Sequence, residues 1–145
     1  MANPSVKTVT IYLIEDDASQ RDSIESLLVY KGYIVKSYSA ANNFLKNVTF
    51  ERPAIVISDI RLPDISGVEL HHALIEKNIN IPIIFISGEA SIQQSVDAMK
   101  QGAIEFLVKP FEIDELINAI TKAIHIELKE INLNLLIENL SPREL

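Results

Sequence analysis

The strongest constraint on the fold of this sequence is the alternation of short apolar runs with longer stretches of helical period. The apolar runs are rich in Ile and Val and lack the regular polar alternation of half-exposed strands. Parallel strands have this composition because helices bury both of their faces. The alternation predicts an α/β fold with a doubly wound, five-stranded parallel sheet, its strands at residues 9–14, 33–38, 53–58, 81–86 and 104–108.

Helical spacing of apolar residues predicts five helices between and after these strands. The spacing from Ser66 to Glu69 is that of a capping box, in which two residues cap a helix start reciprocally. Gly32 and Gly102 suit the ends of the first and fourth helices, because glycine adopts the conformation that often ends a helix. The fifth helix shows no clear stop before Ser141. The predicted helices are 19–30, 40–47, one that opens at 66, 91–101, and one from about 112.

Composition excludes several classes of function. The 145 residues fit one domain, and the absence of cysteine excludes disulfides, thiolate catalysis and cysteine-based metal centres. A net charge of −7 argues against this stretch binding DNA or an anionic membrane through electrostatics. The start of the chain lacks the apolar core of a signal peptide, and no apolar run approaches the roughly 20 residues of a membrane span. We expect an acidic, cytoplasmic protein without a membrane partner.

Polar and charged residues follow the predicted strands at the points where the strands end. Ligands of open parallel sheets bind beyond the carboxyl ends of the strands, so these side chains are expected to meet at one edge. They are Glu15, Asp16 and Asp17 after the first strand, Asp59 after the third, Ser87 after the fourth and Lys109 after the fifth.

Carboxylates that converge at such an edge repel one another unless a cation neutralises them. With oxygen ligands and no cysteine, the expected cation is hard, and Mg²⁺ fits best because carboxylates and phosphoryl oxygens commonly hold it together. Lys109 adds a mobile positive charge, and Ser87 adds a hydroxyl donor for the same group. These residues together predict phosphoryl-transfer chemistry, in which positioning and charge neutralisation dominate.

The strand-end motifs resemble those of the receiver domains of bacterial two-component response regulators. The resemblance covers residues 6–123, with four motifs in order, and residues 66–70 and 109–112 are similar to the FixJ/NarL group, whose receivers precede a LuxR-type helix-turn-helix domain. The motifs are Leu13-Ile14-Glu15-Asp16-Asp17, Ser58-Asp59-Ile60-Arg61-Leu62-Pro63 with Asp64-Ile65-Ser66-Gly67, Ile86-Ser87-Gly88, and Phe106-Leu107-Val108-Lys109-Pro110-Phe111.

The resemblance implies a flavodoxin-like (βα)5 fold with strand order 2-1-3-4-5 and a phosphoacceptor role for Asp59. Asp59 would take a phosphoryl group from a sensor histidine kinase as an acyl phosphate and lose it slowly to water. Asp16 and Asp59 would bind Mg²⁺ directly, with the backbone carbonyl of Arg61 as a third protein ligand and Glu15 acting through water. Glu15 departs from the family pattern, in which Asp is common at this position.

The resemblance also implies roles for residues around the phosphoryl group. Lys109 would pair with the phosphoryl oxygens, and the Lys109–Pro110 peptide would be cis. Ser87 would move to hydrogen-bond one phosphoryl oxygen, and Phe106 matches an aromatic switch position that turns inward on activation. A plain core role for Phe106 remains open. Asp17, the third acid of its run, is expected to turn away from the metal as a helix N-terminal charge.

Other motifs carry less information. His71 and His72 are adjacent, so on a helix they point about 100° apart and cannot face one metal together; we interpret them as a surface pair. The sequence has no glycine-rich phosphate loop, which gives no support to nucleotide binding.

The last helix has an apolar repeat of its own, formed by Ile117, Ile124 and Ile131 with Leu128 and Leu135. Up to residue 124 the repeat can pack on the sheet. After about residue 125, a dimerising coiled coil and a plain linker both remain open. Residues 140–145 resemble the opening of a LuxR-type domain. The expected organisation is a receiver at 1–124, a helical linker at 125–139 and the truncated start of a DNA-binding domain at 140–145.

The first functional hypothesis is a signalling switch that forms the input half of a transcriptional regulator and is not an enzyme. Phosphorylation of Asp59 would draw Ser87 and Phe106 inward and reshape the face of the fourth helix and fifth strand, which would then dimerise. A stand-alone adaptor receiver that acts by protein contact is an alternative. A Mg²⁺-dependent aspartyl phosphatase of the haloacid-dehalogenase type is disfavoured, because that class needs an acid where Arg61 stands.

Overall fold

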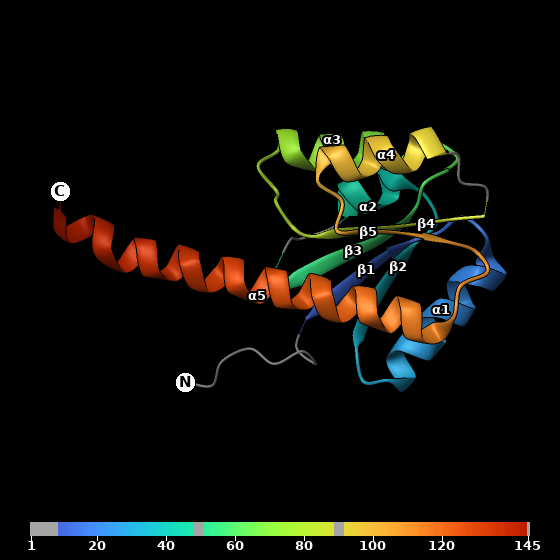
Figure 1. The fold of residues 1–145 in the computed structure, drawn as a ribbon, viewed down its shortest axis with the longest axis horizontal. Coiled ribbons are helices and arrows are strands. Elements are labelled where there is room, and N and C mark those ends of the chain that lie inside the picture. The colour runs from blue at the N-terminus through green and yellow to red at the C-terminus, as the bar shows by residue number, and fades with distance from the viewer. Residues whose placement is uncertain (1–8, 48–50, 89–91, 145) are drawn as a thin grey trace.

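A parallel sheet of five strands forms the middle layer of the molecule (Figure 1). The computed structural model describes residues 9–47, 51–88 and 92–144. The spatial order of the strands is β2-β1-β3-β4-β5, and every neighbouring pair is parallel. The doubly wound, flavodoxin-like sheet and its predicted order are therefore confirmed. The strands are β1 (Thr10–Ile14), β2 (Ile34–Tyr38), β3 (Ala54–Asp59), β4 (Ile83–Ser87) and β5 (Glu105–Val108).

Helices cover both faces of the sheet. Figure 1 shows α1 and α5 on one face and α2, α3 and α4 on the other. The predicted helix starts differ from the observed ones by one residue, whereas the last helix continues beyond the stop expected at Ser141. Within the described residues, no helix has the length and apolarity to cross a membrane. The helices are α1 (Ala18–Tyr30), α2 (Ala41–Asn47), α3 (Gly67–Glu76), α4 (Ile92–Gln101) and α5 (Ile113–Glu144).

Each face of the sheet carries one apolar core. Successive side chains along a strand point to opposite faces, so the apolar residues of each strand are divided between the two cores. On β1, Ile11 and Leu13 are in one core, and Tyr12 and Ile14 are in the other. The central strands β3 and β4 are buried along their whole length. Burial on both faces explains why these strands lack polar alternation in the sequence.

The start of α3 is fixed close to the end of β3. The predicted capping box is present: the Ser66 hydroxyl accepts from the Glu69 N–H at 3.0 Å, and the Glu69 carboxylate accepts from the Ser66 N–H at 3.3 Å. A Cβ on Gly67 would lie 2.8 Å from both the Asp59 carbonyl oxygen and the Phe85 ring. Gly67 is therefore needed for the close approach of α3 to the strand that carries Asp59.

The contact of α5 with the sheet continues past residue 124. Ile124 and Glu127 are buried, and Leu128 packs against the core on this face. The helix then extends beyond the sheet (Figure 1). The division at residues 124 and 139 stays a prediction, and so does the start of a DNA-binding domain at 140–145, because side chains 138–145 lie outside the described part of the chain.

One expectation about the histidines is wrong. His71 is only 6% exposed, whereas His72 is exposed and its Nε2 lies 3.0 Å from the Glu76 carboxylate. The buried face of α3 consists of Gly67, Leu70, His71 and Leu74, so helical periodicity places His71 on the core side. The pair is therefore half buried and half exposed, and not a surface pair.

Candidate functional site

The strand-end residues meet at the carboxyl edge of the sheet, as the sequence predicts. Glu15 and Asp16 follow β1, Asp59 ends β3, Ser87 ends β4, and Lys109 follows β5. They line a cavity of about 310 Å³. The other residues that line it are Asp17, Gln20, Arg61 and Gly88.

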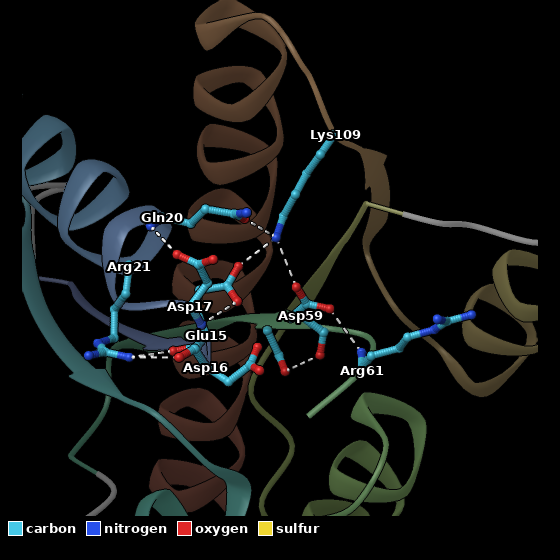
Figure 2. A network of polar contacts seen from close by, with 9 residues as sticks. Glu15, Asp16, Asp17, Gln20, Arg21, Asp59, Arg61 and Lys109 are labelled. Atoms are coloured by element: carbon cyan, nitrogen blue, oxygen red, sulfur yellow. Dashed lines mark hydrogen bonds and ion pairs between the residues drawn. The ribbon is translucent and has the colours of Figure 1, made fainter. Parts of the chain in front are cut away.

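Lys109 is the centre of the polar network (Figure 2). Its Nζ lies 2.9 Å from Oδ2 of Asp59 and 2.6 Å from Oε1 of Glu15, and it also donates to the side-chain oxygen of Gln20. Its backbone N–H donates to the carbonyl of Ser87 at 2.7 Å. The Lys109–Pro110 peptide is cis, as predicted. One ammonium thus connects two acids from different strands.

Asp59 is held from two sides and is only 8% exposed. Its Oδ1 accepts from the Arg61 N–H at 2.9 Å, while its Oδ2 faces Lys109. The side chain of Arg61 points away from the carboxylates (Figure 2). The Asp59 carboxylate therefore opens toward the cavity with a fixed orientation and a cation beside it.

Three carboxylates form a cluster that could hold a metal ion. Ligand oxygens of Glu15, Asp16 and Asp59 all lie within 4.8 Å of one another. A donor set made of oxygens alone is the set that a hard divalent cation such as Mg²⁺ prefers. Asp17 has a different position: it is the N-cap of α1, and its Oδ1 accepts from the Gln20 N–H at 3.0 Å. The helix N-terminal position expected for Asp17 is thus confirmed, and its side chain also lines the cavity.

Burial and pairing shift the ionisation of two of these groups. Burial raises the pKa of Glu15, and hydrogen bonds from Lys109 and from the Asp17 N–H oppose that rise without cancelling it. For Lys109, burial acts to lower the pKa, but hydrogen bonds to Asp59 and Glu15 outweigh burial and leave the pKa raised. Lys109 therefore stays charged, and Glu15 takes up a proton more readily than an ordinary glutamate.

Ser87 and Phe106, the two residues with predicted switch roles, lie on neighbouring strands. Ser87 is buried at the end of β4 and lines the cavity. Phe106 on β5 is partly buried, and its ring centroid lies 6.4 Å from that of Phe85 on β4. The two candidate switch residues are thus on neighbouring strands, and their roles stay predictions.

Sequence reasoning missed two residues that build the site. Gln20 binds Lys109, and Nη1 of Arg21 donates to the backbone carbonyl of Glu15 at 2.8 Å. Arg21 lies in the first turn of α1, where the helix dipole disfavours a cation. A cation at this unfavourable position indicates that it has a partner elsewhere. The partner is the loop of Glu15 and Asp16, whose backbone carbonyls accept from the Arg21 guanidinium.

Comparisons with known proteins agree with this geometry. Residues 11–121 match the family described as the response regulator receiver domain. Nodulation protein W of Bradyrhizobium diazoefficiens is 38% identical over 141 residues, which cover 92% of this chain and 62% of that protein. The transcriptional regulatory protein FixJ of Rhizobium meliloti is 39% identical over 114 residues, 79% of this chain and 56% of that protein. The chain thus spans less than two thirds of these relatives.

Solved structures show the same architecture. The response regulator StyR aligns with a TM-score of 0.86 at 34% identity, over 92% of this chain and 68% of that one. The FixJ-N crystal structure aligns with a TM-score of 0.75 at 38% identity, over 81% of this chain and 94% of that one. Fold, strand-end motifs and sequence match agree, and the chain belongs to the response regulator receiver domain family.

Proposed function

We propose that this protein is the phosphoacceptor of a two-component pathway and that Asp59 is the residue phosphorylated. The observation that carries the proposal is the contact of Asp59 with Lys109 inside a cavity lined by three further acids and Ser87. An Asp59 oxygen attacks the phosphorus of a phosphohistidine on a sensor kinase. The P–N bond breaks, its electron pair stays on the imidazole, and an acyl phosphate forms on Asp59.

Mg²⁺ is the proposed cofactor. Bound at this cluster, it would neutralise the charge of the carboxylates and of the incoming phosphoryl group. Asp16 and Asp59 would hold it directly, the Arg61 carbonyl would be a third ligand, and Glu15 would act through water. Lys109 pairs with the phosphoryl oxygens, and Ser87 donates its hydroxyl to one of them.

The output is proposed to be a conformational change that leads to dimerisation. Ser87 and Phe106 move inward and reshape the face formed by α4 and β5. Exposed apolar side chains on this face suit a protein contact; they are Ile92, Val96, Met99 and Val108. The C-terminal helix adds to the dimer, and a LuxR-type domain outside this sequence would bind DNA and control transcription. Hydrolysis of the acyl phosphate returns the protein to its unphosphorylated state. The protein is proposed to act in the cytoplasm and not to turn over a separate substrate as an enzyme.

Phosphate uptake from acetyl phosphate with Mg²⁺ tests the proposal. Intact-mass measurement should show one added phosphoryl group on the parent and none on Asp59→Asn. Asp22→Asn, an exposed carboxylate on α1, is the matched control and should take up phosphate like the parent. Equal uptake by parent and Asp59→Asn would contradict the proposed site, and multiple turnover on a phosphomonoester would favour the phosphatase alternative.

The second part of the proposal, the transcriptional output, needs a separate test. The proposal predicts that the reading frame downstream of Leu145 encodes a helix-turn-helix domain. The relatives FixJ, a transcriptional regulatory protein, and TodT, a response regulator protein, extend beyond the part that this chain matches. A stop codon directly after Leu145 would favour the stand-alone adaptor.

A further inference from the structure

Gln20 connects the first turn of α1 to the ammonium of Lys109, a residue 89 positions later in the chain. The backbone N–H of Gln20 donates to the Asp17 carboxylate at 3.0 Å, which fixes this turn of the helix. The next residue, Arg21, joins the same turn to the loop of Glu15 by donating to the Glu15 carbonyl at 2.8 Å. The backbone of Gln20 is therefore fixed relative to the cavity of Asp59.

The ammonium of Lys109 has three N–H donors, and the structure gives it three acceptors. Two acceptors are the anions Asp59 and Glu15, at 2.9 and 2.6 Å, and the third is the neutral amide oxygen of Gln20. Figure 2 shows Asp59 and Gln20 on opposite sides of Nζ, with Gln20 reaching it from α1. Of the three acceptors, Gln20 is the one that carries no charge and lies outside the carboxylate cluster.

The contact of Gln20 with Lys109 also forms the boundary between two hollows of the surface. Both residues line the cavity of Asp59, of about 310 Å³, and both line a second groove of about 260 Å³. Ser19 and Ser23 line this second groove as well, and their hydroxyls are possible acceptors for an ammonium. A lysine has a flexible four-carbon stem. The second groove is therefore an alternative direction for the Lys109 side chain.

The three contacts of Lys109 differ in how they respond to a divalent cation. With Mg²⁺ at the carboxylate cluster, Asp59 and Glu15 would share their charge with the metal, whose own charge repels the ammonium. Both anionic contacts of Lys109 are then weaker, whereas the amide oxygen of Gln20, outside the cluster, keeps its strength. Lys109 therefore depends most on Gln20 in the state that would receive the phosphoryl group.

We propose that Gln20 is a positioning residue, whose amide oxygen keeps the ammonium of Lys109 inside the cavity of Asp59 when Mg²⁺ is bound. The inference rests on the proposed function, because it concerns the step in which Lys109 pairs with the phosphoryl oxygens. The N–H that now donates to Asp59 turns to the phosphoryl group on the same side, and the N–H that donates to Gln20 stays in place. Without Gln20, the side chain of Lys109 turns into the second groove.

A double-mutant cycle on the rate of phosphate uptake from acetyl phosphate with Mg²⁺ tests this role. Gln20→Met keeps the length of the side chain without its acceptor and should slow uptake roughly tenfold. The double variant Gln20→Met/Lys109→Met should be no slower than Lys109→Met alone, because Gln20 acts only through the lysine. Gln93→Met, at an exposed glutamine of α4, is the matched control and should behave like the parent. Parent-like uptake by Gln20→Met, or a further tenfold loss in the double variant, would overturn the inference.

A second measurement follows the Lys109 ammonium itself and needs no phosphoryl donor. Ammonium protons give separate NMR signals only where hydrogen bonds slow their exchange with water, and Lys109→Met identifies the signal of this residue. Without Mg²⁺, the signal should be present in both the parent and Gln20→Met. With saturating Mg²⁺, it should persist in the parent and disappear in Gln20→Met.

Persistence of the signal in Gln20→Met with Mg²⁺, or its loss in the parent, would contradict the positioning role. The urea midpoint of Gln20→Met should equal that of the parent, so that a general loss of structure is not the cause. A parent that takes up no phosphate would instead contradict the proposed function, and the ammonium signal would still decide the role of Gln20.

Discussion

The carboxylate of Glu127, which is completely buried on α5, accepts hydrogen bonds from two guanidinium nitrogens of Arg52, 75 residues earlier in the chain. Arg52 Nε lies 3.0 Å from Oε2 and Nη2 lies 2.6 Å from Oε1. Oε2 also accepts from the Ala54 N–H at 2.9 Å. Since Ala54 begins the strand that Asp59 ends, this ion pair fixes α5 to β3 at the point where the helix leaves the sheet.

Removing Arg52 should strongly destabilise the protein. Arg52→Ala leaves a buried carboxylate without its cation, and such a loss costs about 3–5 kcal/mol in the free energy of unfolding. Urea denaturation measures this cost, with exposed Lys100→Ala as a control that should change stability by less than about 0.5 kcal/mol. The double variant Arg52→Met/Glu127→Leu should recover most of the loss, because it removes both charges. If Arg52→Ala alone were as stable as the parent, the ion pair would not contribute to the free energy of unfolding.

Replacing Lys109 should separate metal binding from phosphoryl uptake. Lys109→Met removes a cation 2.9 Å from Asp59 and 2.6 Å from Glu15. The cluster then attracts Mg²⁺ more strongly, by roughly threefold or more in calorimetric titration. Phosphate uptake should fall at least about a hundredfold, because the phosphoryl oxygens lose their ammonium partner. Lys122→Met, on α5, is the control for a lost lysine. Unchanged uptake in Lys109→Met would contradict the role of Lys109.

Mg²⁺ affinity should depend on pH through Glu15. Burial raises the pKa of Glu15 above its ordinary value of 4.5, and protonation would remove the negative charge that Glu15 offers, through water, to the proposed Mg²⁺. Affinity should therefore fall as the pH falls through the raised pKa, at a higher pH than for an ordinary glutamate. Glu15→Gln should bind Mg²⁺ more weakly at pH 7.5 and lose this part of the pH dependence. Parallel pH profiles for the parent and Glu15→Gln would exclude Glu15 from the metal site.

Replacing His71 should stabilise the protein, increasingly so at low pH. Nδ1 of His71 is buried without a hydrogen-bond partner, and burial followed by the charge of His72 lowers its pKa below 6.5. Below about pH 6.5, His71 binds a proton in the unfolded chain but stays neutral in the folded protein. The free energy of unfolding of the parent therefore decreases as the pH falls. His71→Leu should gain about 1 kcal/mol at pH 7.5 and more at pH 5.5 in thermal unfolding. For the exposed His72→Leu control, the difference in stability from the parent should not increase between pH 7.5 and pH 5.5.

Asp64 caps a helix from a distant loop, and its removal should cost stability at neutral pH. Its Oδ1 accepts from the Ala41 N–H at 3.2 Å and its Oδ2 from the Asn42 N–H at 2.7 Å, at the start of α2. Burial acts to raise the pKa of Asp64, but these bonds and the Ile65 N–H outweigh it and lower the pKa below 3.8.

The stabilisation by Asp64 is therefore present above about pH 4 and is lost as the pH falls through the lowered pKa. Asp64→Asn should be about 0.5–1 kcal/mol less stable than the parent at pH 7. At pH 2 the two proteins should unfold alike. A difference that persisted at pH 2 would show that the carboxylate charge is not the cause.

The sequence predicted the sheet and the meeting of the strand-end residues because both depend on local patterns. Strand and helix bounds follow from periodicity within about ten residues, and parallel strands place their carboxyl ends at one edge. Glu15, Asp59, Ser87 and Lys109 therefore met as expected. The prediction for His71 is wrong because helical periodicity places this polar residue beside Leu70 on the buried face of α3.

By itself, the sequence determined the doubly wound fold, the residues at the carboxyl edge and the cis peptide implied by the family motif. The tertiary structure alone decided which distant side chains share a partner. Lys109 divides its ammonium between Asp59 and Glu15, the latter 94 residues away, and Glu127 meets Arg52 across 75 residues. These relationships depend on how helices and strands pack, and periodicity along the chain carries no information about such distant contacts.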